Sequence, residues 1–255
     1  MERTLVCLLL AAVMGVLPVK AQSEGGLLFD AGVEKSFSKK LSLNVEAGFR
    51  TRNDFKTFDR WSGSLGVEYK LMKGLKADAG YSLLYDNYRE KITDNYWRPS
   101  YWGTRHRMNA SLTGTLKLPA SLKVSLRERW QYTYRPETDT ERYYFADYPA
   151  ARWTGSSEGW PATEKVRKSK SKNQLRSRLQ LEYDKKGAQF KPYASMELYN
   201  SLGIEKVRYT LGTDIKLSKQ HSLDVYYRYQ DQRHVDESDY DPDMHYVGVS
   251  YKFKF

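Results

Sequence analysis

The stretch HYVGVSYKFKF, from His245 to Phe255, decides how the rest of the chain is interpreted. Side chains alternate between the two faces of an extended strand, so the valines and aromatic residues of this stretch share one face and the polar residues share the other. An apolar face that ends on a terminal phenylalanine is typical of an outer-membrane barrel strand, with apolar side chains toward lipid. We expect three of these aromatic residues to form the assembly signal that the barrel assembly machinery recognises, namely Tyr251, Phe253 and Phe255.

The same alternation recurs along the chain in segments of roughly ten to thirteen residues, about the length that a tilted membrane strand needs. From Leu41 to Phe49, for example, every second residue is apolar and the residues between them are polar or glycine. Short turns at one end and longer polar loops at the other are typical of outer-membrane barrels, whereas a soluble sandwich would show only the alternation. Short connections lie near 38–40, 73–74, 119–121, 185–187 and 218–221, and mostly longer ones lie at 53–59, 87–105, 135–172, 200–205 and 231–244.

The sequence therefore predicts an all-β fold, a transmembrane up-and-down antiparallel β-barrel of ten to twelve strands. Eleven alternating segments can be counted, although bacterial single-chain barrels normally have an even number of strands. The order of the turns makes the first segment, Leu27–Phe37, run parallel to the last one. We therefore expect twelve strands, with the missing strand hidden in Gln22–Leu27 or in a long loop, unless one of the segments is misassigned.

Residues 1–21 have the features of a secretory signal peptide, which leaves residues 22–255 as one barrel domain. Arg3 precedes an apolar run from Leu5 to Leu17, and small residues precede the expected cut. The only cysteine, Cys7, lies inside this segment, so no disulfide is expected. A mean hydropathy of −0.74 does not argue against a barrel, because only every second strand residue faces lipid. We expect a multi-pass protein in the outer membrane of a gram-negative bacterium.

Arginine is the residue type most suited to a functional role here. Guanidinium groups stay charged and match the geometry of carboxylates and phosphates, so a cluster inside the barrel favours an anion-binding vestibule or pore. The alternative is a closed polar core, in which the arginines pair with Glu46, Glu197 and tyrosine hydroxyls. Both interpretations stay open. The alternation sends eight arginines into the lumen: Arg50, Arg107, Arg127, Arg129, Arg176, Arg178, Arg208 and Arg228.

An enzyme is not expected, and no catalytic residue is assigned. Outer-membrane lipases and deacylases carry a His-x-Ser pair on a strand, because a base two residues along the strand reaches a serine nucleophile. None of the four histidines fits this pattern: His106, His221, His234 and His245 are followed two positions on by Met108, Leu223, Asp236 and Val247.

No cofactor is expected, and only a weak metal site is suggested. The loop carrying Asp239, Asp241 and Asp243 alternates acidic residues that could hold Ca²⁺, although it lacks the glycine of a tight calcium loop. The run KVRKSKSK, from Lys165 to Lys172, could touch phosphates of lipopolysaccharide or simply be mobile. The net charge of +11 does not indicate a nucleic-acid partner, because the chain is expected to be exported and has no recognition motif.

Several patches of the sequence resemble an outer-membrane family known as domain of unknown function 2490. The resemblance covers nearly the whole expected mature chain. It implies a barrel in the outer membrane and supplies no activity and no catalytic residues. The matching stretches are Arg50–Arg52 with Asp59–Trp61, Tyr101–Trp102 with Arg105–Arg107, Leu126–Glu137, Leu175–Asp184, Pro192–Asn200, and Tyr226–Gln230 before Tyr251–Phe255.

The function predicted from the sequence is that of a small porin-like channel for small solutes, anionic ones among them. The expected partners are outer-membrane lipid and lipopolysaccharide, the barrel assembly machinery and those solutes. The alternative is a closed barrel with a structural or surface-binding role, and a lipid-modifying enzyme of the outer membrane comes third. Glu128 is the only charge in the outward row of its strand, so we expect it near the upper interface, at a bulge or against another protein.

Overall fold

The structure of the protein is a computed structural model, which describes residues 23–144, 163–233 and 242–255. The predicted signal peptide and the acidic residues Asp239 and Asp241 lie outside these ranges. In the part of the chain that the structure describes, no helix is long and apolar enough to cross a membrane.

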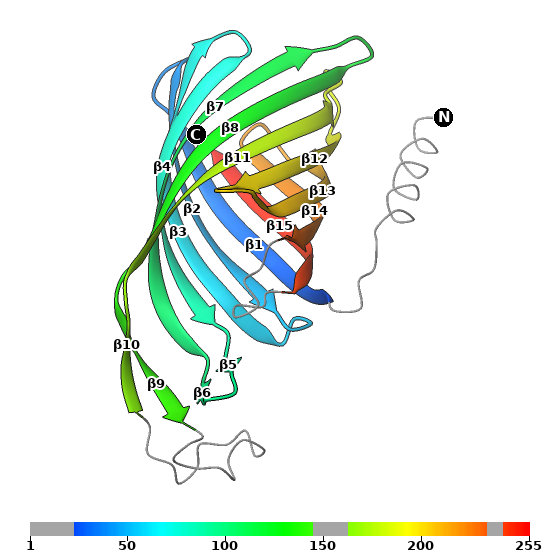
Figure 1. The fold of residues 1–255 in the computed structure, drawn as a ribbon. Coiled ribbons are helices and arrows are strands. Elements are labelled where there is room, and N and C mark those ends of the chain that lie inside the picture. The colour runs from blue at the N-terminus through cyan, green and yellow to red at the C-terminus, as the bar shows by residue number, and fades with distance from the viewer. Residues whose placement is uncertain (1–22, 145–162, 234–241) are drawn as a thin grey trace.

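Eleven long strands form a closed barrel, which confirms the all-β barrel fold (Figure 1). Neighbouring strands are antiparallel hairpin partners everywhere except at the closure, so the barrel is up-and-down as predicted. The strands are β1 (Ser23–Ser36), β2 (Leu41–Arg52), β3 (Thr57–Met72), β4 (Leu75–Tyr88), β7 (Tyr101–Lys117), β8 (Leu122–Arg135), β11 (Lys170–Tyr183), β12 (Phe190–Asn200), β13 (Ile204–Lys216), β14 (His221–Gln232) and β15 (Asp243–Lys254).

The barrel closes through a parallel pair, β1 with β15, which we call the seam. Its register runs from Ser23 opposite Asp243 to Glu34 opposite Lys254, and the backbone N–H of Phe255 donates to the Glu34 carbonyl at 3.0 Å. The strand count of eleven lies within the predicted range, but the expectation of twelve is wrong for the described residues. The reason is that parallel pairing already satisfies both edge strands, so no further strand is needed to complete the backbone hydrogen bonds. Residues from Ser23 onward extend β1 instead of forming a separate strand.

The two ends of the barrel differ in their connections. The short turns, 37–40, 73–74, 118–121, 184–189 and 217–220, lie together at one end, called here the short-turn end. The other end, the long-loop end, carries a small sheet of four strands in the order β10-β9-β6-β5, seen at the bottom of Figure 1. Its strands were expected to be loops: β5 (Lys91–Ile92), β6 (Tyr96–Arg98), β9 (Thr138–Tyr144) and β10 (Thr163–Arg167).

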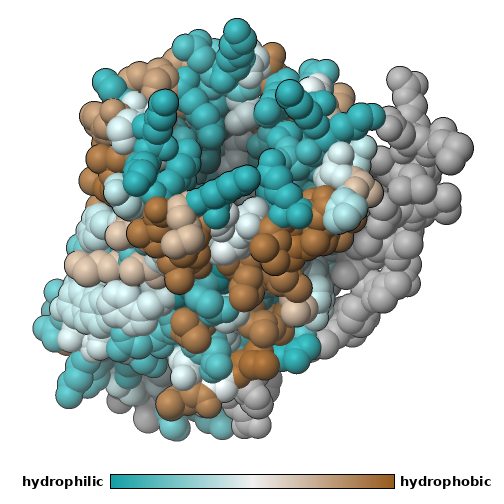
Figure 2. All heavy atoms as spheres, turned by 90° about the horizontal axis from the view of Figure 1, so that it is seen from above, coloured by the Kyte–Doolittle hydropathy of each residue, from teal (hydrophilic) through white to brown (hydrophobic). Residues whose placement is uncertain are grey.

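Aromatic side chains gather on the outer face near both ends, where a membrane barrel carries its interfacial girdles. Near the long-loop end, the rings of Phe49, Phe58 and Trp61 lie 5.5 to 5.9 Å apart. Near the short-turn end, the rings of Phe253 and Phe255 stack at 5.6 Å. Seen from the short-turn end, hydrophilic side chains project beside patches of apolar ones (Figure 2). Apolar side chains such as Val45, Leu65 and Leu126 are exposed on the strands, as a lipid-facing surface requires.

Glu128 lies halfway along β8 and faces outward, because Arg127 and Arg129 on either side of it line the interior. Its pairings with β7 and β11 show no register shift, so Glu128 is not at a bulge. The Ser177 hydroxyl donates to Glu128 Oε2 at 2.6 Å. Ser177 thus supplies a polar partner for a carboxylate that is otherwise surrounded by apolar side chains.

Changing both Phe253 and Phe255 to serine is expected to reduce the amount of folded barrel several-fold while leaving export intact. The variant loses two stacked aromatic side chains at the seam, together with the proposed assembly signal. The measurement is the fraction of heat-modifiable, membrane-inserted protein. Phe190→Ser is the matched control, because Phe190 is also an exposed aromatic near the short-turn end but lies away from the seam. Equal losses in both variants, or no loss, would contradict a special role for the last strand.

Candidate functional site: a cationic lumen

The interior of the barrel contains a cavity of ≈ 1470 Å³ to which every barrel strand contributes. Among the described residues, 22 arginine or lysine side chains and 10 aspartate or glutamate side chains line it. This excess of positive charge follows from the strand alternation, which places the basic residues of most strands on the inward face. The lining includes all eight arginines that the sequence sends inward: Arg50, Arg107, Arg127, Arg129, Arg176, Arg178, Arg208 and Arg228.

Seven further arginines that were not among those predicted also line the cavity. Three of them lie on β2, β3 and β7, namely Arg52, Arg60 and Arg105. The signal was present in each case: Arg52 and Arg105 lie two residues from inward-facing arginines, and Arg60 precedes the outward Trp61. Extending the alternation strictly along β2, β3 and β7 would have found all three.

Glu197 on β12 is the acid to which several of the lumen arginines bind. Arg127 donates to its Oε1 at 2.6 Å, and Arg176 donates to both oxygens at 3.0 and 2.9 Å. Tyr199 donates its hydroxyl to Oε2 at 3.0 Å, and Arg208 Nη1 lies 4.0 Å from the same oxygen. Glu197 is only 7% exposed and is not part of the cavity lining. The carboxylate therefore lies behind its cations, which form the surface that a solute meets.

The register explains why these groups meet. Across β8, β11, β12 and β13, Arg127 is opposite Arg178, which is opposite Glu197, which is opposite Arg208. Side chains in one such row lie on the same face at close range. One carboxylate in a row of three arginines leaves the row with a net positive charge.

Aspartates hold five further lumen arginines, most of them toward the long-loop end. These pairs are partly buried, so their geometry fixes the guanidinium groups against the wall of the lumen. Asp59 pairs with Arg50 and with Arg52 at 3.1 Å, Asp86 pairs with Arg60 and with Arg105 at 2.7 Å, and Asp78 accepts from Arg129 at 3.1 Å.

Four lumen cations have neither a hydrogen bond nor an ion pair with the described residues, and a fifth is held only by an aromatic ring. Lys170 and Lys252 lie near the two ends of the lumen, whereas Arg107 on β7 and Arg178 on β11 lie in its middle, and Arg107 Nε is buried without a hydrogen-bond partner. Lys206 on β13 places its ammonium group 4.3 Å from the centre of the Tyr199 ring. Positive charge in this part of the lumen is therefore not balanced by the protein alone.

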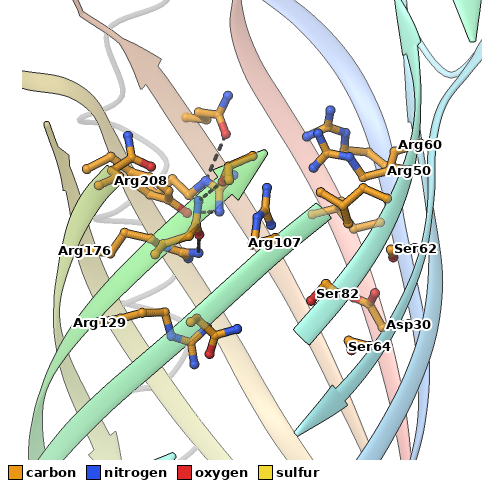
Figure 3. Close-up of a pocket in the computed structure, with 18 of the residues that line it drawn as sticks. Asp30, Arg50, Arg60, Ser62, Ser64, Ser82, Arg107, Arg129, Arg176 and Arg208 are labelled. Carbon is orange, nitrogen blue, oxygen red and sulfur yellow. Dashed lines mark hydrogen bonds between the residues drawn. The ribbon is translucent and has the colours of Figure 1, made fainter. Parts of the chain in front are cut away.

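Hydroxyl and acidic groups occupy another part of the wall. Asp30 on β1 and Ser62, Ser64 and Ser82 on β3 and β4 lie together in Figure 3, apart from Arg129, Arg176 and Arg208. Ser64 is directly opposite Ser82 in the sheet. The lumen thus has one strongly basic wall, formed by β8, β11 and β13, and a more acidic, hydroxyl-bearing wall formed by β1, β3 and β4.

The short-turn end of the lumen is more evenly charged. Lys123 pairs with Glu182 and Lys76 pairs with Glu68, each at 2.5 Å. In the turn after β11, a hydrogen bond from Lys191 holds the pKa of Asp184 below its usual range. Lys252 is the unpaired lumen cation of this end, and most of the other unpaired cations of the described residues lie in the middle and the long-loop half of the barrel.

The other residues singled out by the sequence do not form a site. Asp243 is buried, and its carboxylate accepts hydrogen bonds from the Tyr229 hydroxyl and the Gln232 backbone N–H, both at 2.8 Å. In the described part of the chain, no three histidine, cysteine or acidic residues are grouped as metal ligands would be. Of the assembly-signal residues, Tyr251 bonds to His221 at 2.5 Å, and Phe255 is 52% exposed at the end of the chain.

Three histidines lie on the outer face, each within hydrogen-bond distance of a tyrosine hydroxyl. The distance from the histidine Nδ1 to the tyrosine hydroxyl oxygen is 2.7 Å for His106 and Tyr81, 2.5 Å for His221 and Tyr251, and 2.5 Å for His245 and Tyr227. The fourth, His234, lies outside the described residues. These pairs belong to the aromatic girdles, where residues with an apolar body and a polar edge are favoured.

Comparison with known proteins supports the fold and the family. The translocator domain of autotransporter NalP from Neisseria meningitidis matches with a TM-score of 0.50 and 12% identity, over 91% of this chain and 90% of that chain. The β domain of the Bordetella autotransporter BrkA matches with a TM-score of 0.45 and 11% identity, over 85% and 82%. No curated protein matches the sequence. A family model described as "Protein of unknown function (DUF2490)" matches residues 25–241, and the chain therefore belongs to this family, as the sequence patches predicted.

Proposed function

We propose that this protein is an outer-membrane channel for small anionic solutes. The observation that carries the proposal is the excess of basic over acidic side chains along one cavity, 22 against 10. Positive side chains along a narrow lumen lower the electrostatic barrier for negative solutes and raise it for cations. The cavity lining runs from Lys123 and Lys252 near the short-turn end to Arg135 and Arg167 near the long-loop end.

The size of the cavity favours a channel over a filled barrel. Small barrels fill their interiors with side chains, which would leave little free space. The ≈ 1470 Å³ that remain here, with all described side chains in place, would hold about 50 water molecules at ~30 Å³ each. This volume is therefore large enough to hold hydrated ions and small organic anions.

The compartment and partners belong to the same proposal. The alternating strands, the two aromatic girdles and the secretory signal peptide predicted from the sequence are together typical of gram-negative outer-membrane barrels. In this setting the outer face would contact lipid and lipopolysaccharide, and the last strand would be the part that the assembly machinery binds.

Replacing both Arg129 and Arg178 with glutamine is expected to shift the reversal potential in a salt gradient toward zero selectivity. Both line the basic wall; Arg178 has no acidic partner among the described residues, and loss of Arg129 also leaves Asp78 without its arginine. Single-channel recording in planar bilayers provides the measurement. The shift should be smaller in 1 M salt, where the Debye length falls to about 3 Å.

Two variants control for this result. Arg233→Gln removes a charge that lies beyond the end of β14 and pairs with Asp231, so selectivity should stay close to that of the parent. Lysine at positions 129 and 178 should keep most of the selectivity, because it keeps the charge. A parent barrel that passes no current and admits no small anion into liposomes would contradict the channel.

A closed structural or surface-binding barrel is the second candidate. It is favoured by the ion pairs at Glu197, Asp59 and Asp86, which tie many arginines to the wall. The same recording distinguishes the two functions, because a closed barrel would form no channel in either salt.

A further inference from the structure

We propose that the middle of the lumen contains a binding site for a multiply charged oxyanion, such as phosphate, a phosphate ester or a dicarboxylate. The site is formed by Arg176, Lys206 and Arg208 around the ring of Tyr199, with Arg107 of β7 beside them, and these groups are called here the Tyr199 cluster. This inference names the class of solute that the proposed channel would carry. Transport of that solute rests on the channel proposal, whereas binding at the site does not.

The first argument is the convergence of cations on one aromatic ring. The guanidinium carbons of Arg176 and Arg208 lie 4.4 and 4.7 Å from the centre of the Tyr199 ring, and the ammonium nitrogen of Lys206 lies 4.3 Å from it. Tyr199 is only 3% exposed, so the ring serves as a fixed support for three cationic groups. Arg107 lies on β7 and is within electrostatic range of both Arg176 and Lys206.

The second argument is that these charges are not neutralised by the protein. Glu197 is the acid of this cluster, and it is shared by Arg176, Arg127 and the more distant Arg208. Arg107 and Lys206 have no acidic partner among the described residues. Positive charges held together away from bulk water repel each other strongly, so an anion bound from solution would relieve a substantial electrostatic cost.

The third argument concerns the surface that a solute meets. All four cations line the cavity, whereas Glu197 does not. Arg176 and Arg208 are already oriented by bonds to Glu197 at 2.9 Å and to Gln230 at 2.9 Å, so little side-chain entropy would be lost on binding. Figure 3 shows Arg107 between Arg176 on one side and Arg50 and Arg60 on the other.

The charge and geometry favour an oxyanion with at least two negative charges over chloride. Guanidinium groups offer parallel N–H donors that match two oxygens of one carboxylate or phosphate, and a spherical halide cannot use both. A dianion also neutralises the two cations that lack an acid with one bound molecule, which costs less binding entropy than two chloride ions.

The test measures phosphate binding to the folded barrel in detergent, by isothermal titration calorimetry at constant ionic strength with chloride as the competing ion. We expect the parent protein to bind phosphate in preference to chloride. The double variant R107Q/K206Q should weaken phosphate binding on the order of tenfold for each charge-assisted hydrogen bond that it removes. The matched control K123Q/K252Q removes the same number of positive charges from the short-turn end of the same cavity and should leave binding within about twofold of the parent.

Equal affinity for phosphate and chloride, or equal weakening in both double variants, would overturn the site. If R107Q/K206Q does not fold, the parent protein alone decides through its phosphate and chloride affinities, and R107K, which keeps the charge, should retain most of the binding. The bilayer recording separates this inference from the channel. Cluster-dependent phosphate binding without current would retain the site and refute the channel, whereas anion-selective current without phosphate preference would do the reverse.

Discussion

Replacing Glu197 with glutamine lowers the free energy of unfolding of the barrel by about 3 kcal/mol or more, the cost expected when one partner of a buried ion pair is removed. Glutamine keeps the shape and one acceptor oxygen, but it removes the negative charge that Arg127, Arg176 and Arg208 share. The loss comes from the remaining cations, which repel each other in a part of the lumen that already holds Lys206. Urea titration of the folded barrel in lipid, followed by heat modifiability or tryptophan fluorescence, measures the change.

Glu205→Gln is the control for this loss. Glu205 pairs with Lys172 at 2.5 Å near the long-loop end, where both side chains are partly exposed, so removing its charge should cost no more than about 1 kcal/mol. Phosphate added to E197Q should restore part of the lost stability, because an anion would replace the missing negative charge. Comparable losses in E197Q and E205Q would mean that Glu197 does not hold the arginine cluster together.

Single cysteines at Ser23 and Leu202 should react with a membrane-impermeant maleimide in intact cells, whereas a cysteine at Lys73 should react only after the outer membrane is permeabilised. The parallel seam places the start of β1 at the long-loop end, where Leu202 also lies. Labelling in intact cells should therefore be complete at these two sites and absent at the opposite end. Lys73 lies in the short turn between β3 and β4. Leu202 and Lys73 are exposed, and Ser23 is half-buried.

The parent protein serves as the background for this labelling, since its only cysteine, Cys7, lies in the predicted signal peptide. A cysteine at Ser23 that reacts only after permeabilisation, together with Lys73, would contradict the parallel closure and the odd strand number. Labelling of all three sites in intact cells would instead contradict insertion of the barrel across the membrane.

Strand positions and facing directions could be predicted from the sequence because they depend on local alternation. Arg127, Glu128 and Arg129 show how far this goes: the two arginines face the lumen and the glutamate faces outward, as the period of two requires. The same rule extended without exception would also have identified Arg60 and Arg105.

Properties that depend on pairing between distant strands could not be predicted. The partners of Glu197 depend on the register across four strands. Alternation does not fix this register, because a shift by two residues keeps every side chain on the same face. The closure of β1 on β15 joins the two ends of the chain, and no local pattern distinguishes parallel from antiparallel pairing there. The small sheet beyond the barrel has strands of two to seven residues, too short for a recognisable period.

The seam also has a consequence for the order in which the molecule folds. Ser23 and Asp243 are 220 positions apart, whereas the other barrel strands pair with neighbours that follow much sooner in the chain. Closing a longer loop costs more conformational entropy, and contacts between distant residues form slowly. The growing sheet therefore stays open, with β1 and β15 as its two free edges, until the last pairing joins them. Because parallel pairing is slightly weaker per residue than antiparallel pairing, this pairing is the last to form and the first to separate when the barrel unfolds.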